Sequence, residues 1–362
     1  MAGGEGTSNF LGKYLVEPWF KLFPRFAVNN FVPMPSTFEI EVSNKCNKKC
    51  VICEHTYWKE PSRDVTFEEF KELVDQFPNL KWVNLTGEGD AFLNPDYIKM
   101  IAYLKKKHKL PIYLVESFDL LNKETSKKVI KLGVDGIWVS WDSSNKKTYE
   151  KIKRGCKWDR SLKNLKDLIE LKKEMKSPIP ELCFRFIVTK LNVHEMPDFI
   201  DFIAGLGDRE SLGDGYRVEF AGLLCFKEVE HLYVDKIPDE IRNEVLKRAE
   251  KHGIRVAFAH SSKEELPPLH ECRAWAEPYI MMGGYVMPCC AVLMSNKRDF
   301  LRKYAFGNIY ETPFKKIWNS KRYRKFREMI TLKNKKVPIL CEGCRAYNTT
   351  VREKKYGVAE KI

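Results

Sequence analysis

Three cysteines lie within a stretch of eight residues, at Cys46, Cys50 and Cys53. Thiolates so close in sequence can converge on one inorganic centre. Structural zinc closes a tetrahedron of four ligands, and a fully protein-bound iron–sulfur cluster also takes four cysteines. Three local thiolates therefore leave one coordination position open for a substrate or a cofactor. The lysines around them favour thiolates and offset the negative charge of a cluster. A zinc site that takes a distant fourth ligand, such as His55, is the alternative.

A second group of cysteines lies near the end of the chain. It comprises Cys272, Cys289, Cys290, Cys341 and Cys344, with Gly284 between the first two. A cysteine–glycine hairpin followed by a Cys-x2-Cys pair has the spacing of a metal site, which zinc also fits. The spacing thus predicts a second, small, metal-stabilised domain. The cysteines that lie apart from both groups are predicted to be buried apolar filler, and these are Cys156, Cys183 and Cys225.

Short apolar runs alternate with longer amphipathic ones along most of the chain. Strands are predicted at residues 37–42, 82–87, 111–117, 136–142, 182–189 and 216–223, with helices between them. The first helix follows Thr66, which forms a capping-box pattern with Glu69. Six such alternations predict a parallel α/β fold, either an open barrel or a doubly wound sheet. Ligands bind at the carboxyl ends of the strands in such folds, and the cysteine triplet directly follows the first strand.

Polar segments at the ends of the later strands complete a family pattern. Their residues are Thr86, Gly87 and Glu88 at the second strand, Ser117 at the third, Ser140 and Asp142 at the fourth, and Thr189 and Asn192 at the fifth. With the cysteine triplet, they resemble the radical S-adenosylmethionine (SAM) superfamily from about Phe38 to Leu224. Ile52 departs from the pattern, because the family usually has an aromatic residue there. The resemblance implies a partial (β/α)6 TIM-like barrel in which these polar residues contact SAM.

The same resemblance implies a mechanism. Cys46, Cys50 and Cys53 hold a [4Fe–4S] cluster, and SAM chelates the open iron through its amino and carboxylate groups. One electron, from a donor such as ferredoxin or flavodoxin, leads to cleavage of SAM into methionine and a 5′-deoxyadenosyl radical. The radical then abstracts hydrogen from an unactivated C–H bond, and the protein brings the radical and the target hydrogen together.

The C-terminal cysteines resemble the auxiliary-cluster domains of radical SAM enzymes, called SPASM or, in a shorter form, twitch. The full SPASM pattern has seven cysteines, whereas this group has five. The resemblance implies one auxiliary [4Fe–4S] cluster held by Cys272, Cys289, Cys341 and Cys344, with electron transfer as its role. The choice between Cys289 and Cys290 stays open. The predicted units are an N-terminal segment at 1–37, the barrel at 38–230, a connection at 231–268, an α+β auxiliary domain at 269–350 and a charged tail at 351–362.

The net charge of the 362-residue chain is +14. An anionic partner accounts for this charge, but lysines spread over solvated helix faces do so too, and we favour the latter. No apolar run approaches the roughly 20 residues of a membrane span, and no secretory signal is visible, so a cytoplasmic location is predicted. The aromatic and basic segment at 10–35 is predicted to cap the barrel or contact a second subunit. Peripheral membrane contact through this segment is the alternative.

The substrate is the least determined part of the function. We predict an oxygen-sensitive enzyme that acts on a small-molecule or lipid-like anionic substrate and completes an oxidation or forms a C–C or C–S bond. Arg185 and Arg217 are candidates for binding the anion, while Glu116, Asp119 and Glu219 are candidates for the general base of an oxidation. The alternatives are an RNA-modifying enzyme, although the chain has no recognisable RNA-binding module, a peptide-modifying enzyme, and a zinc-binding interaction protein without catalysis. Nucleic acid is thus a disfavoured partner, and no oligomeric state is predicted.

Overall fold

The structure, a computed structural model, describes residues 22, 26, 30, 32–213, 217–224, 226–259, 268–295, 297–332, 336–342, 344 and 347. The charged tail and nearly all of the aromatic and basic N-terminal segment lie outside the described residues. Within the described ranges, no helix is both long enough and apolar enough to cross a membrane.

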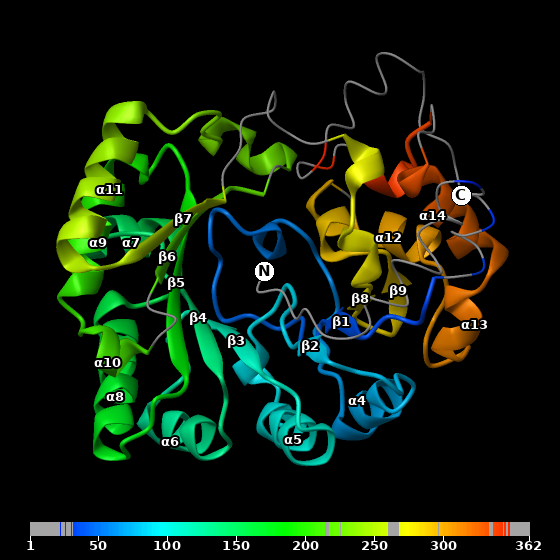
Figure 1. Cartoon of the computed structure of the whole chain (residues 1–362), viewed down its shortest axis with the longest axis horizontal. Coiled ribbons are helices and arrows are strands. Elements are labelled where there is room, and N and C mark those ends of the chain that lie inside the picture. The colour runs from blue at the N-terminus through cyan, green and yellow to red at the C-terminus, as the bar shows by residue number, and fades with distance from the viewer. Residues whose placement is uncertain are drawn as a thin grey trace.

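Strands β1 to β7 in the described part of the chain pair in parallel and form most of the fold (Figure 1). They are β1 (Thr37–Ile40), β2 (Trp82–Asn84), β3 (Tyr113–Glu116), β4 (Gly136–Ser140), β5 (Glu181–Val188), β6 (Arg217–Gly222) and β7 (Arg255–Ala259). Strands β3 to β7 pair in chain order in one sheet, whereas β1 and β2 pair in another. The predicted α/β class is confirmed. Strand β7, which sequence analysis assigned to the connection, pairs with β6 and extends the parallel sheet.

Each strand turns alternate side chains to the two faces of its sheet. In β4, Ile137 and Val139 are fully buried, while Trp138 and Ser140 on the other face are partly exposed. Figure 1 shows α8, α9 and α11 along one face of the five-stranded sheet, so the other face is the interior of the barrel. The helices of this part are α4 (Phe67–Val74), α5 (Tyr97–Tyr103), α6 (Lys123–Lys131), α7 (Lys146–Ile152), α8 (Trp158–Glu174), α9 (Met196–Ala204), α10 (Arg209–Leu212) and α11 (Asp239–His252).

Local sequence signals explain how these helices begin. The Thr66 hydroxyl accepts a hydrogen bond from the backbone N–H of Glu69 at 3.2 Å, and the Glu69 carboxylate accepts one from the N–H of Thr66 at 2.9 Å. This reciprocal arrangement satisfies two N–H groups that the first turn of α4 leaves without partners. The predicted capping box is therefore confirmed.

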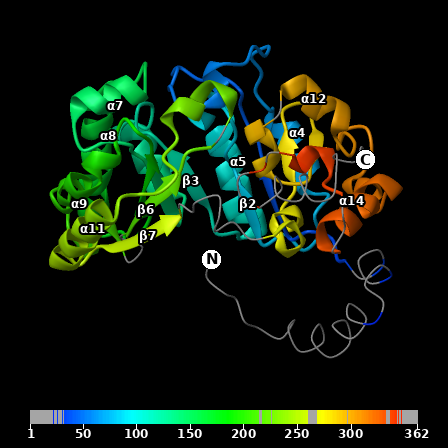
Figure 2. The same ribbon diagram turned by 90° about the horizontal axis from the view of Figure 1, so that it is seen from above.

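The C-terminal part joins the barrel through a shared sheet. Its hairpin, β8 (Tyr279–Met281) and β9 (Tyr285–Met287), extends the sheet beyond β1 in the order β2-β1-β8-β9. Strand β8 runs parallel to β1, and β9 runs antiparallel to β8. Helices α12 (Arg298–Tyr304), α13 (Phe314–Trp318) and α14 (Lys321–Thr331) complete this part, which lies beside the barrel in both ribbon views (Figures 1 and 2).

One buried ion pair also joins the two parts. Glu41, just after β1, is fully buried, and its carboxylate accepts hydrogen bonds from the guanidinium of Arg298 on α12 at 2.5 Å and from the N–H of Met282 at 2.7 Å. The guanidinium carbon of Arg298 also lies 4.4 Å from the ring centroid of Trp58. A buried charge is tolerated only when it is paired, so this contact fixes how the C-terminal part sits on β1.

Arg298→Ala is expected to destabilise the fold strongly. The change leaves the carboxylate of Glu41 buried without its cation, which costs about 3–5 kcal/mol. Chemical denaturation followed by circular dichroism measures the loss. Arg302→Ala on the same helix is the matched control, because Arg302 pairs with Glu60 while remaining 29% exposed. A loss no larger than that of the control would contradict the role given to Arg298.

Candidate functional site

The cysteine triplet lies on the loop that follows β1. Backbone hydrogen bonds tie this loop to its surroundings, from the N–H of Lys49 to the carbonyl of Arg154 at 2.7 Å and from the N–H of Asp90 to the carbonyl of Lys45 at 2.7 Å. The three thiol residues are partly exposed. The loop is therefore held at the carboxyl ends of the strands, as the sequence predicted.

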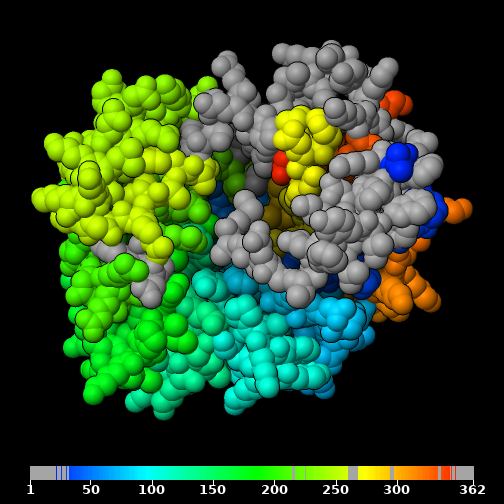
Figure 3. All heavy atoms as spheres, viewed as in Figure 1, coloured from blue at the N-terminus to red at the C-terminus, as the bar shows by residue number. Residues whose placement is uncertain are grey.

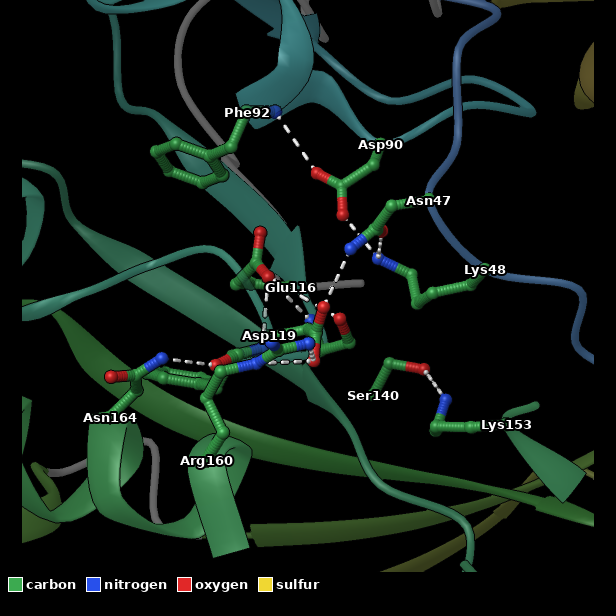
Figure 4. Close-up of polar contacts among 12 residues, drawn as sticks. Asn47, Lys48, Asp90, Phe92, Glu116, Asp119, Ser140, Lys153, Arg160 and Asn164 are labelled. Carbon is green, nitrogen blue, oxygen red and sulfur yellow. Dashed lines mark hydrogen bonds and ion pairs between the residues drawn. The ribbon is translucent and has the colours of Figure 1, made fainter. Parts of the chain in front are cut away.

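Side chains between the cysteines anchor the loop to its neighbours (Figure 4). Asn47 donates to the carboxylate of Asp119 at 2.7 Å, and Arg160 from α8 donates to the same carboxylate at 3.0 and 2.5 Å. Lys48 forms an ion pair with Asp90, and both side chains are almost fully buried. Asp90 on the loop after β2 and Asp119 on the loop after β3 thus hold the cluster loop in place. They do so through Lys48 and Asn47, which lie between the first two cysteines.

Buried lysines set the electrostatics of the thiols. Burial raises the pKa of Cys46 and of Cys50, while Lys48 opposes the shift at Cys46 and Lys153 opposes it at Cys50. Burial acts to lower the pKa of Lys48, but Asp90 and Glu116 raise it overall, so Lys48 stays charged. The structure therefore brings Lys48 and Lys153, rather than all the lysines of the loop, into range of the thiols.

The segment from Thr86 to Glu88 packs directly against β1. A Cβ on Gly87 would lie 2.8 Å from the Cα of Glu41, and a Cβ on Gly89 would lie 2.3 Å from the carbonyl oxygen of Ser43, so only glycine fits at either position. Burial raises the pKa of both Glu88 and Glu54, and the charge of Glu88 raises that of Glu54 further. Two acids thus meet beside the last cysteine of the triplet.

Several buried polar atoms around these acids have no hydrogen-bond partner. They are Oε1 of Glu41, Oε1 of Glu54, and Nε and Nη1 of Arg298. Unsatisfied buried groups of both signs are unusual in a folded protein. Their arrangement fits a ligand that carries both an ammonium and a carboxylate group.

The other residues predicted to contact SAM are Ser117, Ser140, Asp142, Thr189 and Asn192. Asp142 is fully buried, pairs with Lys153 at 2.8 Å and accepts from the N–H of Ile187 at 2.8 Å. Asn192 donates to the carbonyl of Asp142 at 2.9 Å and accepts from the N–H of Thr189 at 2.7 Å. These side chains bond to one another, so their role as SAM contacts stays a prediction. Ser140 accepts from Lys153 at 2.8 Å, and Ser117 is nearly buried.

The thiols of the second group also come together, with one exception. Burial raises the pKa of Cys289, and the thiols of Cys341, Cys344 and Cys272 raise it further. Cys290 instead contacts Glu39 on β1, and burial followed by the charge of Glu39 raises its pKa. The structure therefore gathers Cys272, Cys289, Cys341 and Cys344 and turns Cys290 toward the barrel strand.

Among the described residues, no three His, Cys, Asp or Glu side chains are placed to hold one metal.

A cationic and aromatic group lies on the interior face of the sheet. The guanidinium carbons of Arg185 and Arg217 lie 4.3 and 4.5 Å from the ring centroid of Trp138. Arg185 pairs with Glu219 at 2.8 Å, whereas the buried Nε of Arg217 has no hydrogen-bond partner. An arginine stacked on an aromatic ring keeps its donors aimed at an anion.

Comparison with family models decides the identity of the site. Residues 40–203 match the model of the radical SAM superfamily, and residues 272–345 match the SPASM model, described as an iron-sulfur cluster-binding domain. The chain belongs to the radical SAM superfamily. This radical SAM enzyme uses SAM, a [4Fe–4S] cluster and an auxiliary iron–sulfur centre. Its three local thiols and its unsatisfied charged atoms fit those groups, and the zinc alternative is not favoured.

Relatives and solved structures agree with this assignment. A tungsten-containing aldehyde ferredoxin oxidoreductase cofactor-modifying protein from Pyrococcus furiosus is 25% identical, over 80% of this chain and 82% of its own. An AdoMet-dependent heme synthase from Methanosarcina barkeri is 23% identical, over 86% and 91%. The crystal structure of Streptococcus suis SuiB bound to S-adenosylmethionine has a TM-score of 0.63 at 16% identity and covers 92% of this radical SAM enzyme and 76% of SuiB. The last likeness shows the shared TIM-like fold.

Sequence reasoning missed several residues of this site. Nothing in the spacing of Asn47 and Asp119, or of Arg298 and Glu41, marks them as partners, because they lie far apart in the chain. Glu54 could have been recognised from the sequence, since an acidic residue that directly follows the last cysteine of the triplet must lie near the cluster.

Asn47→Ala is expected to loosen the cluster loop. The variant loses a hydrogen bond to a buried carboxylate, which lowers the local opening free energy by roughly 1.5–3 kcal/mol. Hydrogen exchange followed by mass spectrometry should show faster exchange at residues 45–51. Asn122→Ala, which removes the N-cap of α6, is the control and should leave this segment unchanged. Equal exchange in Asn47→Ala and the native chain would refute the anchoring role.

Proposed function

We propose that this radical SAM enzyme abstracts a hydrogen atom from an anionic small molecule bound in the barrel, and completes an oxidation or forms a C–C or C–S bond. The observation that carries the proposal is the stacking of Arg185 and Arg217 on Trp138 at the interior face of the sheet. The charge of Arg185 is matched by Glu219, so Arg217 is left to supply the donor for a phosphate or carboxylate.

The residues proposed to hold the cofactors have separate tasks. Cys46, Cys50 and Cys53 would hold the [4Fe–4S] cluster, and the carboxylate of Glu88 would accept the ammonium group of SAM. When bound, these groups supply the 5′-deoxyadenosyl radical. Burial, and then the charge of Glu88, raise the pKa of Glu54, so Glu54 takes up a proton more readily than an exposed carboxyl group does.

The proposed substrate must be oriented within reach of the loop. Ser140, Arg185 and Glu219 occupy one register row across β4, β5 and β6. Trp138 and Arg217 lie two residues nearer the amino ends of their strands, on the same face. An anion held by Arg217 would therefore extend toward the carboxyl ends, where the triplet lies. Such fixed placement limits the hydrogens that a radical can reach.

The names of the relatives support a small-molecule substrate. One relative acts on a cofactor and another makes heme, and a probable GTP 3′,8-cyclase from Methanococcus maripaludis is 24% identical over 76% of this chain and 94% of its own. GTP carries phosphates that stacked arginines can bind. A peptide substrate is the second candidate, because SuiB was also solved with its precursor peptide SuiA, although that likeness concerns the fold. A lipid-like substrate and contact with a membrane stay predictions.

The auxiliary thiols are proposed to serve electron transfer. Cys289 comes two residues after β9, whose hairpin partner β8 pairs with β1. Cys272, Cys289, Cys341 and Cys344 would complete all four ligand positions of a cluster, which leaves none for a substrate. An oxidation would need such an acceptor for the electron that a substrate radical gives up.

The activity test is anaerobic reconstitution followed by SAM cleavage. With a strong reductant, we expect about eight irons per chain and formation of 5′-deoxyadenosine. Cys50→Ala should abolish cleavage, because one thiolate of the open cluster is lost. Cys341→Ala should retain cleavage in the absence of substrate and lose product formation. An iron content of about four per chain or fewer, with no 5′-deoxyadenosine formed, would contradict the proposal.

A pair of variants tests the task given to Glu88. Glu88→Gln should lower SAM affinity at least about tenfold, since a buried anion facing the ammonium is lost. Glu54→Gln should bind SAM nearly as well as the native chain, because glutamine keeps a neutral donor toward Glu88. Native affinity should weaken as the pH is lowered, since burial raises the pKa of Glu88 and protonation removes its charge. Equilibrium dialysis measures both effects, and equal losses in the two variants would contradict the assignment.

A further inference from the structure

A pocket of about 570 Å³ opens on the outer side of the cluster loop. Cys46, Lys49, Trp58 and Lys59 are among the residues that line it. One thiol residue of the triplet is therefore reached from the surface, and Figure 2 shows the loop at an edge of the molecule. The pocket gives a partner molecule a short approach to the site without entry into the barrel.

The rim of this pocket carries unbalanced positive charge. Lys49 and Lys59 are exposed, and neither has an acidic partner among the residues that the structure describes. Arg154 is also exposed and donates to the carbonyl of Lys49 at 3.1 Å, which adds a third cation. The acid that lines the pocket, Glu60, is already paired with Arg302 at 2.8 Å.

The opposite charges nearby do not cancel this excess. Lys45 pairs with Asp64 at 2.6 Å, so that pair is neutral. Lys48 and Asp90 are buried together beneath the loop and contribute nothing to the rim. The surface around Cys46 therefore presents three uncompensated cations, from Lys49, Lys59 and Arg154, to an approaching partner.

We infer that this basic pocket is the docking site of the electron donor, an acidic one-electron carrier protein of the ferredoxin or flavodoxin class. The inference rests on the proposed function, because it takes Cys46 as a cluster ligand. In the step that docking permits, the donor is oxidised by one electron and the cluster is reduced by one electron, with no proton or atom transferred. Weak redox encounters use small interfaces that are steered by complementary charge.

The barrel interior is a poorer place for this partner. The stacked arginines there lie on the inner face of the sheet, where a folded protein does not reach them, and the proposed substrate needs that space. RNA is the other polyanion that a basic rim attracts, and it is tested as a competing outcome.

The test uses the reconstituted full-length enzyme and a reduced plant-type [2Fe–2S] ferredoxin as the probe. The variant Lys59→Glu with Arg154→Glu reverses two rim charges outside the cysteine triplet. Lys127→Glu, on the exposed side of α6, is the control for a change of charge alone. Iron content and circular dichroism confirm that each variant is folded and loaded.

We expect the double variant to bind oxidised ferredoxin at least about tenfold more weakly and to be reduced by ferredoxin at least about tenfold more slowly in stopped flow. Reduction by photoreduced deazaflavin, which needs no docking surface, should be unchanged. The native rate with ferredoxin should fall as salt is added, and the rate of the double variant should respond less.

Two results would overturn the docking site. One is equal ferredoxin affinity and equal reduction rates in the double variant and in Lys127→Glu. The other is loss of transfer-RNA binding in the double variant with ferredoxin binding unchanged. Formation of 5′-deoxyadenosine with deazaflavin as reductant tests the proposed function separately, so failure of one does not imply failure of the other.

Discussion

Strand β1 is the element on which the geometry of both iron–sulfur sites depends. It pairs with β2 on one edge and with β8 on the other, so the barrel and the C-terminal part share one sheet. The cluster loop starts from its carboxyl end, and the hairpin that precedes Cys289 lies against its edge. Because hydrogen bonds fix the strands relative to one another, a shift of either site would break this ladder.

Buried ion pairs add to the positioning of the site residues that the sheet provides. Lys48 with Asp90, Lys153 with Asp142 and Arg298 with Glu41 are three pairs with almost no solvent contact. The first links the cluster loop to the segment after β2, the second links the end of α7 to the segment after β4, and the third links the end of β1 to α12. Desolvation offsets much of the attraction in such pairs, so their contribution lies in the single arrangement that satisfies them. The buried pairs therefore favour one arrangement of the residues around the site.

Local patterns predicted much of this molecule. The six strands, the capping box at Thr66 and the position of the triplet after the first strand follow from periodicity and turn chemistry that a short window contains. The pairing of β8 with β1 was not predictable in this way, because three-residue strands carry little pattern and their partners are distant. The contact between Cys290 and Glu39 and the hydrogen bond from Asn47 to Asp119 also depend on tertiary contacts alone.

The shared strand also constrains how the protein is made. Glu41 and Met282, which bond across the sheet, are 241 residues apart in sequence. On the ribosome, β1 therefore emerges long before β8, and one of its edges stays unpaired during most of synthesis. An open edge of this kind invites pairing with other chains, and contacts of such long range form slowly. This connectivity thus places completion of the β1 edge, against which the hairpin before Cys289 lies, late in synthesis.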